Sequence, residues 1–184
     1  MPTFVNIVGY NGTGKTTLAK RLEEYLGFNR INGDAFRLFV INEIAYFKDL
    51  DLSHQNDRHE YLSPLVVQYR TELSLSLLRA GENVIMEGSG LLKSYRELYL
   101  HKIKQQDPKT KTVLIVCKIA EDKLADRLRL RDASTQDESW QIMHKAKENI
   151  FEMPTEDEAD AILIYSQDNY DDIKSKLKDV MEAA

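Results

Sequence analysis

The sequence lacks several features that would place it in a specialised class of protein. Its 184 residues include a single cysteine, Cys117, so no disulfide bond can form within the chain. No apolar run approaches the roughly 20 residues of a membrane-spanning helix, and the first residues do not have the pattern of a signal peptide. We therefore expect a soluble, cytoplasmic protein without a membrane partner. The net charge of −5 offers no general attraction for nucleic acid, although a local basic groove is compatible with it.

What the sequence does contain is an alternation of short apolar runs with amphipathic segments. The runs predict five strands, at residues 4–8, 29–32, 83–87, 112–118 and 161–165. Helical spacing predicts helices at residues 17–26, 36–45, 65–79, 95–106, 121–131, 140–151 and 170–181. Strands separated by helices imply an α/β fold, with a five-stranded parallel sheet flanked by helices on both faces. A chain of this length fits one domain, residues 1–184, and Cys117 in the fourth run is expected to be a buried, inert thiol.

The most specific pattern is at residues 9–16, which read GYNGTGKT and match the phosphate loop G-x-x-x-x-G-K-[ST]. The match lies between the first predicted strand and the first predicted helix, as such a loop requires. Glycines let successive backbone N–H groups turn inward around a phosphate, and the helix N-terminus adds partial positive charge. We expect Lys15 to bind the β- and γ-phosphates of ATP and to assist catalysis, and the Thr16 hydroxyl to bind Mg²⁺. The predicted nucleotide-binding residues of this stretch are Gly9, Asn11, Gly12, Thr13, Gly14, Lys15, Thr16 and Thr17. A glycine-rich turn that binds nothing is the alternative, and the agreement of pattern, order and position disfavours it.

A carboxylate, Asp34, follows the second predicted strand directly. Its position suits a helix N-cap, and it equally suits a general base that takes a proton from a substrate hydroxyl. Arg37 lies one helical turn later and can share a face with Asp34. Because an acid and a guanidinium beside a phosphate loop can deprotonate an alcohol and hold an anion, we favour Asp34 as the base and Arg37 as an acceptor-binding residue. Arg70 could also reach the acceptor, so we place the acceptor site in residues 34–70.

Two further groups lie at positions that suit a nucleotide site. Glu87 ends the third predicted strand, where a carboxylate can orient Mg²⁺ or its water, and Gly88 lets a ligand approach the backbone. A cap for the following turn is the alternative role of Glu87. Arg127 and Arg131 are four residues apart in the fifth predicted helix and share a face. We expect them to stabilise charge on the transferring phosphoryl group, with a lid at about residues 127–139, although a solvated helix face would give the same pattern.

Four blocks of the chain, residues 9–16, 33–37, 84–89 and 124–131, resemble the P-loop kinases related to nucleotide kinases. Within them, the chain is most similar to the group of polynucleotide 5′-kinase, the zeta toxins and related small-molecule kinases. The second block is similar to D-x-[FY]-R, in which the Asp is the general base and the Arg binds substrate. The third is similar to V-I-x-E-G-[ST], and the fourth to the L-x-x-R-L-x-x-R that opens the lid. The resemblance implies that Arg127 lies near the adenine, that the later arginines bind phosphate, and that the loop after the last strand borders the adenine.

These observations favour an ATP-dependent, Mg²⁺-requiring kinase that phosphorylates a hydroxyl or phosphate group of a small polar metabolite, sugar, nucleoside or nucleotide. A polynucleotide 5′-hydroxyl kinase is the alternative acceptor class; it is disfavoured because acidic residues interleave with the basic and aromatic ones of the acceptor segment. A regulatory ATPase that transfers phosphate only to water is the alternative from another class. Against it, the N-K-x-D motif of GTPase switches is missing, and no D-x-x-G follows the third strand. The oligomeric state is left open.

Overall fold

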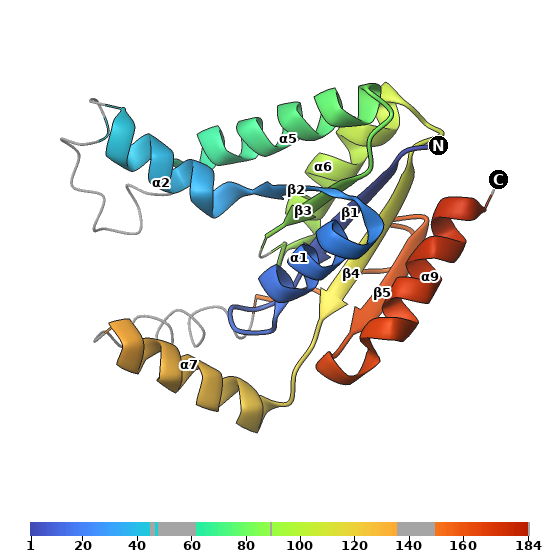
Figure 1. Ribbon diagram of the computed structural model, residues 1–184. Coiled ribbons are helices and arrows are strands. Elements are labelled where there is room, and N and C mark those ends of the chain that lie inside the picture. The colour runs from blue at the N-terminus through green and yellow to red at the C-terminus, as the bar shows by residue number, and fades with distance from the viewer. Residues whose placement is uncertain (45–46, 48–61, 89, 136–149, 184) are drawn as a thin grey trace.

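The computed structural model describes residues 1–44, 47, 62–88, 90–135 and 150–183 (Figure 1). Within them, five strands form one sheet in the order β2-β3-β1-β4-β5, and every neighbouring pair is parallel. The predicted fold class is therefore confirmed, and each strand end lies within one residue of its predicted position. The strands are β1 (Thr3–Val8), β2 (Asn29–Asn32), β3 (Val84–Glu87), β4 (Lys111–Cys117) and β5 (Ala161–Tyr165).

Helices connect the strands in the predicted order. They are α1 (Lys15–Leu26), α2 (Gly33–Glu43), α5 (Ser63–Arg79), α6 (Lys93–Gln106), α7 (Glu121–Thr135) and α9 (Tyr170–Glu182), with a short 3-10 helix, η2 (Gln167–Asn169), before α9. The start of the predicted lid, up to residue 135, is therefore helical. Most of the helix predicted at 140–151, and residues 45–46 and 48–61 of the acceptor segment predicted at 34–70, lie outside the described residues. Among the described residues, no helix combines the length and apolar character that crossing a membrane requires.

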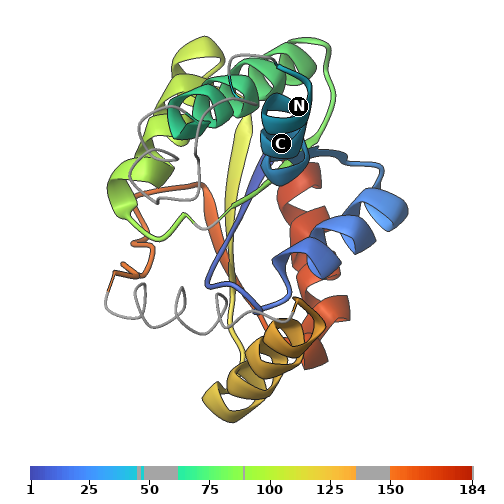
Figure 2. The same ribbon diagram turned by 90° about the vertical axis from the view of Figure 1, so that its left-hand side faces the viewer.

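Alternate residues of each strand face opposite layers of helices. Val5 and Ile7 of β1 pack in the core with α1 and α9, whereas Phe4 and Val8 pack with α5 and α6. Figure 2 shows these two pairs of helices on opposite sides of the sheet. Because both faces are covered, β1 is buried along its whole length, and its sequence is a continuous apolar run rather than an alternating one.

The start of α2 differs from the prediction. The helix begins at Gly33, three residues before the predicted Phe36, because the side chain of Asn32 caps it. The Asn32 Oδ1 atom accepts hydrogen bonds from the backbone N–H groups of Asp34 (3.0 Å) and Ala35 (3.2 Å). This bonding satisfies two of the N–H groups that a helix start leaves without partners. The cap role considered for Asp34 is therefore wrong, because the Asn32 side chain caps this helix instead.

A buried ion pair joins the segment before β5 to the residues after β3. Arg96 donates from Nε to Glu158 Oε2 (2.7 Å) and from Nη2 to Oε1 (3.0 Å), and neither side chain has any exposed surface. Arg96 Nη1 also donates to the carbonyl oxygens of Gly90 (2.9 Å) and Leu91 (3.2 Å). Burial raises the pKa of Glu158, but the hydrogen bonds from Arg96 and from the Thr155 backbone outweigh this and hold the pKa below its usual range. The pair therefore fixes the loop that follows β3 to a distant part of the chain.

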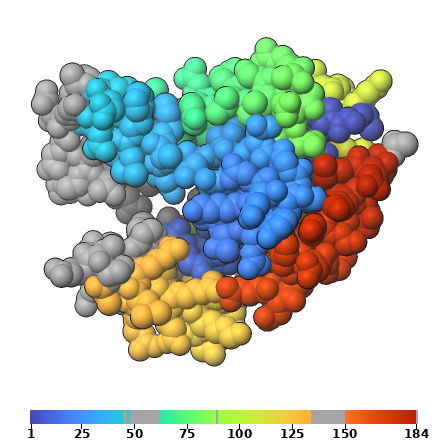
Figure 3. Space-filling model, in the orientation of Figure 1, coloured from blue at the N-terminus to red at the C-terminus, as the bar shows by residue number. Residues whose placement is uncertain are grey.

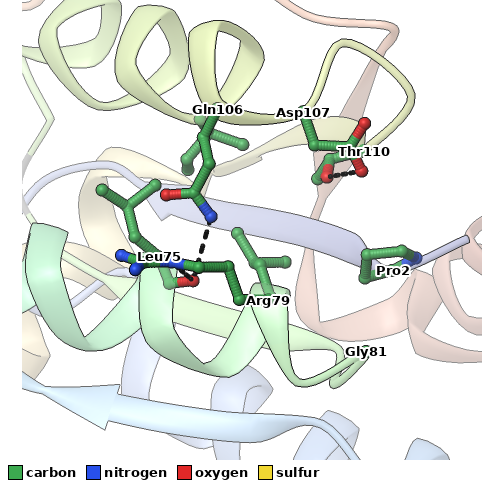
Figure 4. Close-up of a pocket in the computed structure, with 9 residues that line it drawn as sticks. Pro2, Leu75, Arg79, Gly81, Gln106, Asp107 and Thr110 are labelled. Carbon is green, nitrogen blue, oxygen red and sulfur yellow. Dashed lines mark hydrogen bonds between the residues drawn. The ribbon is translucent and has the colours of Figure 1, made fainter.

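A cavity of about 340 Å³ lies between α5 and α6, at the amino ends of the strands (Figure 4). The side chains of Gln106 (Nε2, 3.2 Å) and Arg79 (Nε, 3.2 Å) both donate to the Leu75 carbonyl oxygen beside it. Ligands of open parallel sheets bind at the carboxyl ends of the strands, which is the opposite edge. The cavity is therefore separate from the candidate site described next.

Candidate functional site

The predicted phosphate loop joins β1 to α1 and has the backbone of such a loop. Gly9, Gly12 and Gly14 have φ angles of 140°, 86° and 96°. Gly12 also packs closely: a Cβ atom there would lie 2.8 Å from the Leu124 side chain of α7. Both the positive φ and the contact explain why this position is glycine. Asn11 lies half-buried in the same turn.

Side chains of the loop hold its own carbonyl groups. The Lys15 ammonium donates to the carbonyl oxygens of Gly9 (2.8 Å) and Tyr10 (2.7 Å). The Thr13 hydroxyl also donates to the Tyr10 carbonyl (2.8 Å), so this predicted nucleotide-binding residue has a contact that closes the loop. Thr17 lies exposed in the first turn of α1. The loop is thus shaped by its own contacts, with a lysine ammonium at its centre.

Thr16 and Glu87, the two predicted metal ligands, lie in contact. The Thr16 hydroxyl donates to Glu87 Oε2 (2.6 Å), and the Glu87 side chain is only 9% exposed. The other carboxylate oxygen, Oε1, accepts from Arg30 Nη1 (2.5 Å), so Glu87 does not cap the turn that follows it. Hydroxyl and carboxylate oxygens are the donors that Mg²⁺ prefers, so this pair fits the predicted metal. No cluster of three or more His, Cys, Asp or Glu side chains occurs in the described part of the chain, so nucleotide oxygens and water would supply the remaining ligands.

Arg30 is a site residue that the sequence analysis missed. It bridges Glu87 of β3 and Glu23 of α1, to which its Nε donates at 3.0 Å. Burial lowers the pKa of Arg30, but the two carboxylates outweigh this and raise it. The signal was present in the register, because Asn32 pairs with Glu87 and Arg30 lies two residues earlier on the same face. Reading that signal requires knowing that β2 and β3 are neighbours.

Asp34 and Arg37 lie at the carboxyl end of β2, in the first turns of α2. Arg37 Nη1 donates to Asp34 Oδ1 at 2.9 Å, so the two side chains share a face as predicted. The Asp34 side chain is 79% exposed and that of Arg37 37%. Because Asn32 caps the helix, the Asp34 carboxylate is not needed as a cap. It is exposed and can contact a molecule that binds from solvent.

Arg70 reaches the same edge of the sheet from α5. Its guanidinium lies against the backbone at the ends of β2 and β3: a Cβ atom at Gly33 would be 2.0 Å from its Nε, and one at Gly88 would be 2.9 Å from its Nη1. The neighbouring Tyr69 ring stacks on Phe36 of α2, with ring centres 3.9 Å apart and an angle of 4° between the planes. The structure therefore brings Arg70 against the backbone that directly precedes Asp34, and an aromatic contact joins the two helices that carry these residues.

Helix α7 lies against the phosphate loop. Arg127 Nη1 donates to the Gly12 carbonyl oxygen (2.9 Å), and the same guanidinium nitrogen is 3.9 Å from where a Cβ atom of Gly14 would be. Arg131 is exposed one turn further along, while Arg129 points elsewhere and pairs with Asp126. Figure 3 shows the surface hollowed between α2 and α7. The helices that carry predicted donor and acceptor residues thus lie on the two sides of one hollow.

The end of β4 packs against the start of the phosphate loop. Cys117 is buried there, and a Cβ atom at Gly9 would lie 2.7 Å from the Cys117 carbonyl oxygen. Burial raises the pKa of the thiol to about 12, although the positive charge of Lys15 acts in the opposite direction. The expectation that this thiol is buried is confirmed.

A family model described as an AAA domain, AAA_33, matches residues 5–149, which contain every site residue described above. The chain belongs to the AAA_33 family. No curated protein sequence matches this AAA_33 chain.

Solved structures similar to this AAA_33 protein include several kinases. A sugar kinase from Janibacter sp. HTCC2649 is 17% identical, with 98% of this chain and 96% of that chain covered and a TM-score of 0.62. The APS kinase of Mycobacterium tuberculosis in complex with AMPPNP and APS is 18% identical, with 99% and 98% covered and a TM-score of 0.63. Kti12 from Chaetomium thermophilum in complex with ADP-AlF3 is 14% identical, with 98% and 100% covered and a TM-score of 0.61. The predicted resemblance to P-loop kinases is confirmed at the level of the fold, and fold and loop together support nucleotide binding.

Proposed function

We propose that the protein transfers the γ-phosphate of ATP to a hydroxyl group of a small polar metabolite, sugar, nucleoside or nucleotide. The observation that carries the proposal is the Asp34 carboxylate. It is 79% exposed, is not used to cap its helix, and lies beside Arg37 at the sheet edge that carries the phosphate loop. A hydrolase that uses water as its acceptor has no need of such a pair. Asp34 is the proposed general base, and Arg37 is proposed to fix the acceptor.

In the proposed reaction, Asp34 takes the proton of the acceptor hydroxyl as its oxygen bonds to the γ-phosphorus. The bond between that phosphorus and the bridging oxygen breaks, and ADP leaves. Lys15 and the loop N–H groups bind the phosphates, while Arg127 and Arg131 offset charge on the moving phosphoryl group. Thr16 and Glu87 would hold Mg²⁺, which, when bound, neutralises charge on the β- and γ-phosphate oxygens.

The variant Asp34→Asn tests this proposal. It keeps the size of the side chain but removes the base, so we expect ATP affinity to stay within about twofold while phosphate transfer falls roughly 10²- to 10⁴-fold. Glu43→Gln is the matched control, because Glu43 is an exposed acid at the other end of the same helix. Transfer that survives nearly intact in Asp34→Asn would show that the base is elsewhere.

The acceptor itself can be sought with γ-labelled ATP. Pools of sugars, hydroxy acids, nucleosides, nucleotides and 5′-hydroxyl oligonucleotides are incubated with the protein, and labelled products are separated. A labelled small molecule supports the proposal, and a labelled oligonucleotide would assign a polynucleotide kinase instead. ATP turnover that proceeds at full rate without any acceptor would favour a regulatory ATPase.

A further inference from the structure

We infer that the acceptor carries a negatively charged group, a carboxylate or a phosphate, which binds to Arg70 next to the hydroxyl that is phosphorylated. This inference rests on the proposed function and narrows its substrate class. Arg70 extends from α5 to the carboxyl ends of β2 and β3, where its guanidinium lies against Gly33 and Gly88. Gly33 directly precedes Asp34 in the chain, so the guanidinium lies against the backbone next to the residue that carries the proposed base.

The glycines are what make room for this arginine. A Cβ atom at Gly33 would lie 2.0 Å from Nε and 2.2 Å from Nη2 of Arg70, and one at Gly88 would lie 2.9 Å from Nη1. No side chain larger than hydrogen fits at residue 33 while Arg70 keeps this position. The α2–α5 contact between Phe36 and Tyr69, at 3.9 Å, fixes the helix that carries Arg70 against the helix that carries Asp34. The position of the guanidinium is therefore specified by its surroundings on several elements.

Arg70 has no carboxylate partner among the described residues. Two acids at this edge are already paired, Glu87 with Arg30 at 2.5 Å and Asp34 with Arg37 at 2.9 Å. The Nε atom of Arg70 is buried and donates no hydrogen bond within the described residues. A guanidinium that is partly removed from water and has no carboxylate partner gains most from an anion, since charge-assisted hydrogen bonds are the strong ones.

Tyr99 also interacts with Arg70 and supplies no negative charge. Burial raises the pKa of the Tyr99 phenol, and Arg70 only partly opposes this, so the phenol stays neutral at pH 7. At the acceptor edge of the sheet, Arg37 and Arg70 contribute two positive charges, and Asp34 contributes one negative charge. The net positive charge is next to a base that must receive a proton, and an anionic substituent on the acceptor balances it. Hydroxy acids, sugar acids, and phosphorylated sugars or nucleosides have a hydroxyl and an anion in one small molecule.

Paired acceptors that differ only in this group test the inference: gluconate against glucose, glucose 6-phosphate against glucose, and AMP against adenosine. Labelled phosphate from ATP should pass to an anionic member and not to its neutral partner, and the productive pair tells carboxylate from phosphate. Arg70→Met should raise the KM for that acceptor roughly 10- to 100-fold while ATP affinity is unchanged, and Arg70→Lys should recover part of the loss. Arg79→Met is the matched control, because Arg79 lies exposed at the far end of the same helix.

A second variant and a second readout make the test independent of finding the natural acceptor. Gly33→Ala leaves Arg70 in the chain but displaces its guanidinium, so it should reproduce the effect of Arg70→Met. With the phosphate loop saturated by a non-hydrolysable ATP analogue, added sulfate should raise the melting temperature of the wild type and not that of Arg70→Met. Equal transfer to a neutral acceptor, or equal stabilisation of both proteins by sulfate, would overturn the inference. Transfer to neutral acceptors would overturn this inference but not the proposed kinase function. The proposed function itself fails if ATP is only hydrolysed and no acceptor is phosphorylated.

Discussion

Replacing Arg96 by methionine should destabilise the protein far more than replacing any surface cation. Both partners of the Arg96–Glu158 pair lack exposed surface, and the guanidinium makes two hydrogen bonds to the carboxylate and two to the Gly90 and Leu91 carbonyl oxygens. Methionine fills similar volume without any donor. Glu158 would then remain as a buried charge without its cation, beside two carbonyl groups that have lost a donor.

The expected cost follows from this burial. Removing one member of a buried pair costs about 3–5 kcal/mol, most of it from the charge left behind. For a chain of this size each kcal/mol corresponds to a fall of about 2–4 °C in melting temperature, so Arg96→Met should melt roughly 6–20 °C lower than the wild type. The double variant Arg96→Met/Glu158→Leu should recover most of the loss, because it leaves no buried charge unpaired.

Urea and thermal unfolding at pH 7 measure these differences. Lys176→Met is the matched control, since Lys176 forms an exposed pair with Asp172 at 2.9 Å, and such pairs contribute less than about 1 kcal/mol. If Arg96→Met unfolds within about 1 kcal/mol of the wild type, the level of the surface control, the buried pair does not stabilise the fold as expected. If the double variant is no more stable than the single one, the cost comes from lost packing rather than from an unpaired charge.

Two further predictions concern the phosphate loop and the acid stability of the fold. Gly12→Ala, at a φ of 86° and with a leucine of α7 2.8 Å from the new Cβ, should lower ATP affinity and reduce the free energy of unfolding by about 1–3 kcal/mol. Gly27→Ala, at a φ of 69° with open space around it, should destabilise the fold less and leave ATP binding unchanged. Titration calorimetry with ATP measures binding to both variants. Burial raises the pKa of Asp160, but hydrogen bonds, first from Lys104, outweigh this and hold the pKa below its usual range. Stability from this group is therefore present above about pH 4 and lost as the pH falls through the lowered pKa. In Asp160→Asn the urea midpoint should therefore depend less on pH below about pH 4 than in the wild type. An unchanged pH profile in that variant would contradict the assignment.

The fold was predictable because its signals are local. The strands β1, β3 and β4 are buried on both faces and are nearly continuous apolar runs, whereas the edge strands β2 and β5 are only partly buried. The ends of all five were predicted within one residue. Helix ends were less accurate, since they depend on individual side-chain hydrogen bonds. For α2, the start is set by the hydrogen bonds that the Asn32 side chain accepts from the N–H groups of Asp34 and Ala35. The spacing of apolar residues along the sequence does not predict these bonds.

The site was predictable where it follows a motif and was missed where it depends on neighbours in space. Residues 9–16 and the Asp34–Arg37 spacing are readable within one turn of helix or loop. Arg30 required the β2–β3 register, and the partners Arg96 and Glu158 are 62 residues apart in sequence, with no local pattern that links them. Arg70 could be proposed as an acceptor-binding residue from the sequence, but the position of its guanidinium against Gly33 and Gly88 depends on how α5 packs over the sheet.

The strand order explains how one short segment serves both halves of the site. Because β3 lies between β1 and β2, its last residues meet the phosphate loop on one side and the acceptor edge on the other. Glu87 contacts Thr16 at 2.6 Å, and the next residue, Gly88, is where Arg70 lies. Two consecutive residues therefore face the proposed metal and the proposed anion. A shift of this strand end would change both distances together, which gives a physical reason for the buried Arg96–Glu158 pair that holds the loop following it.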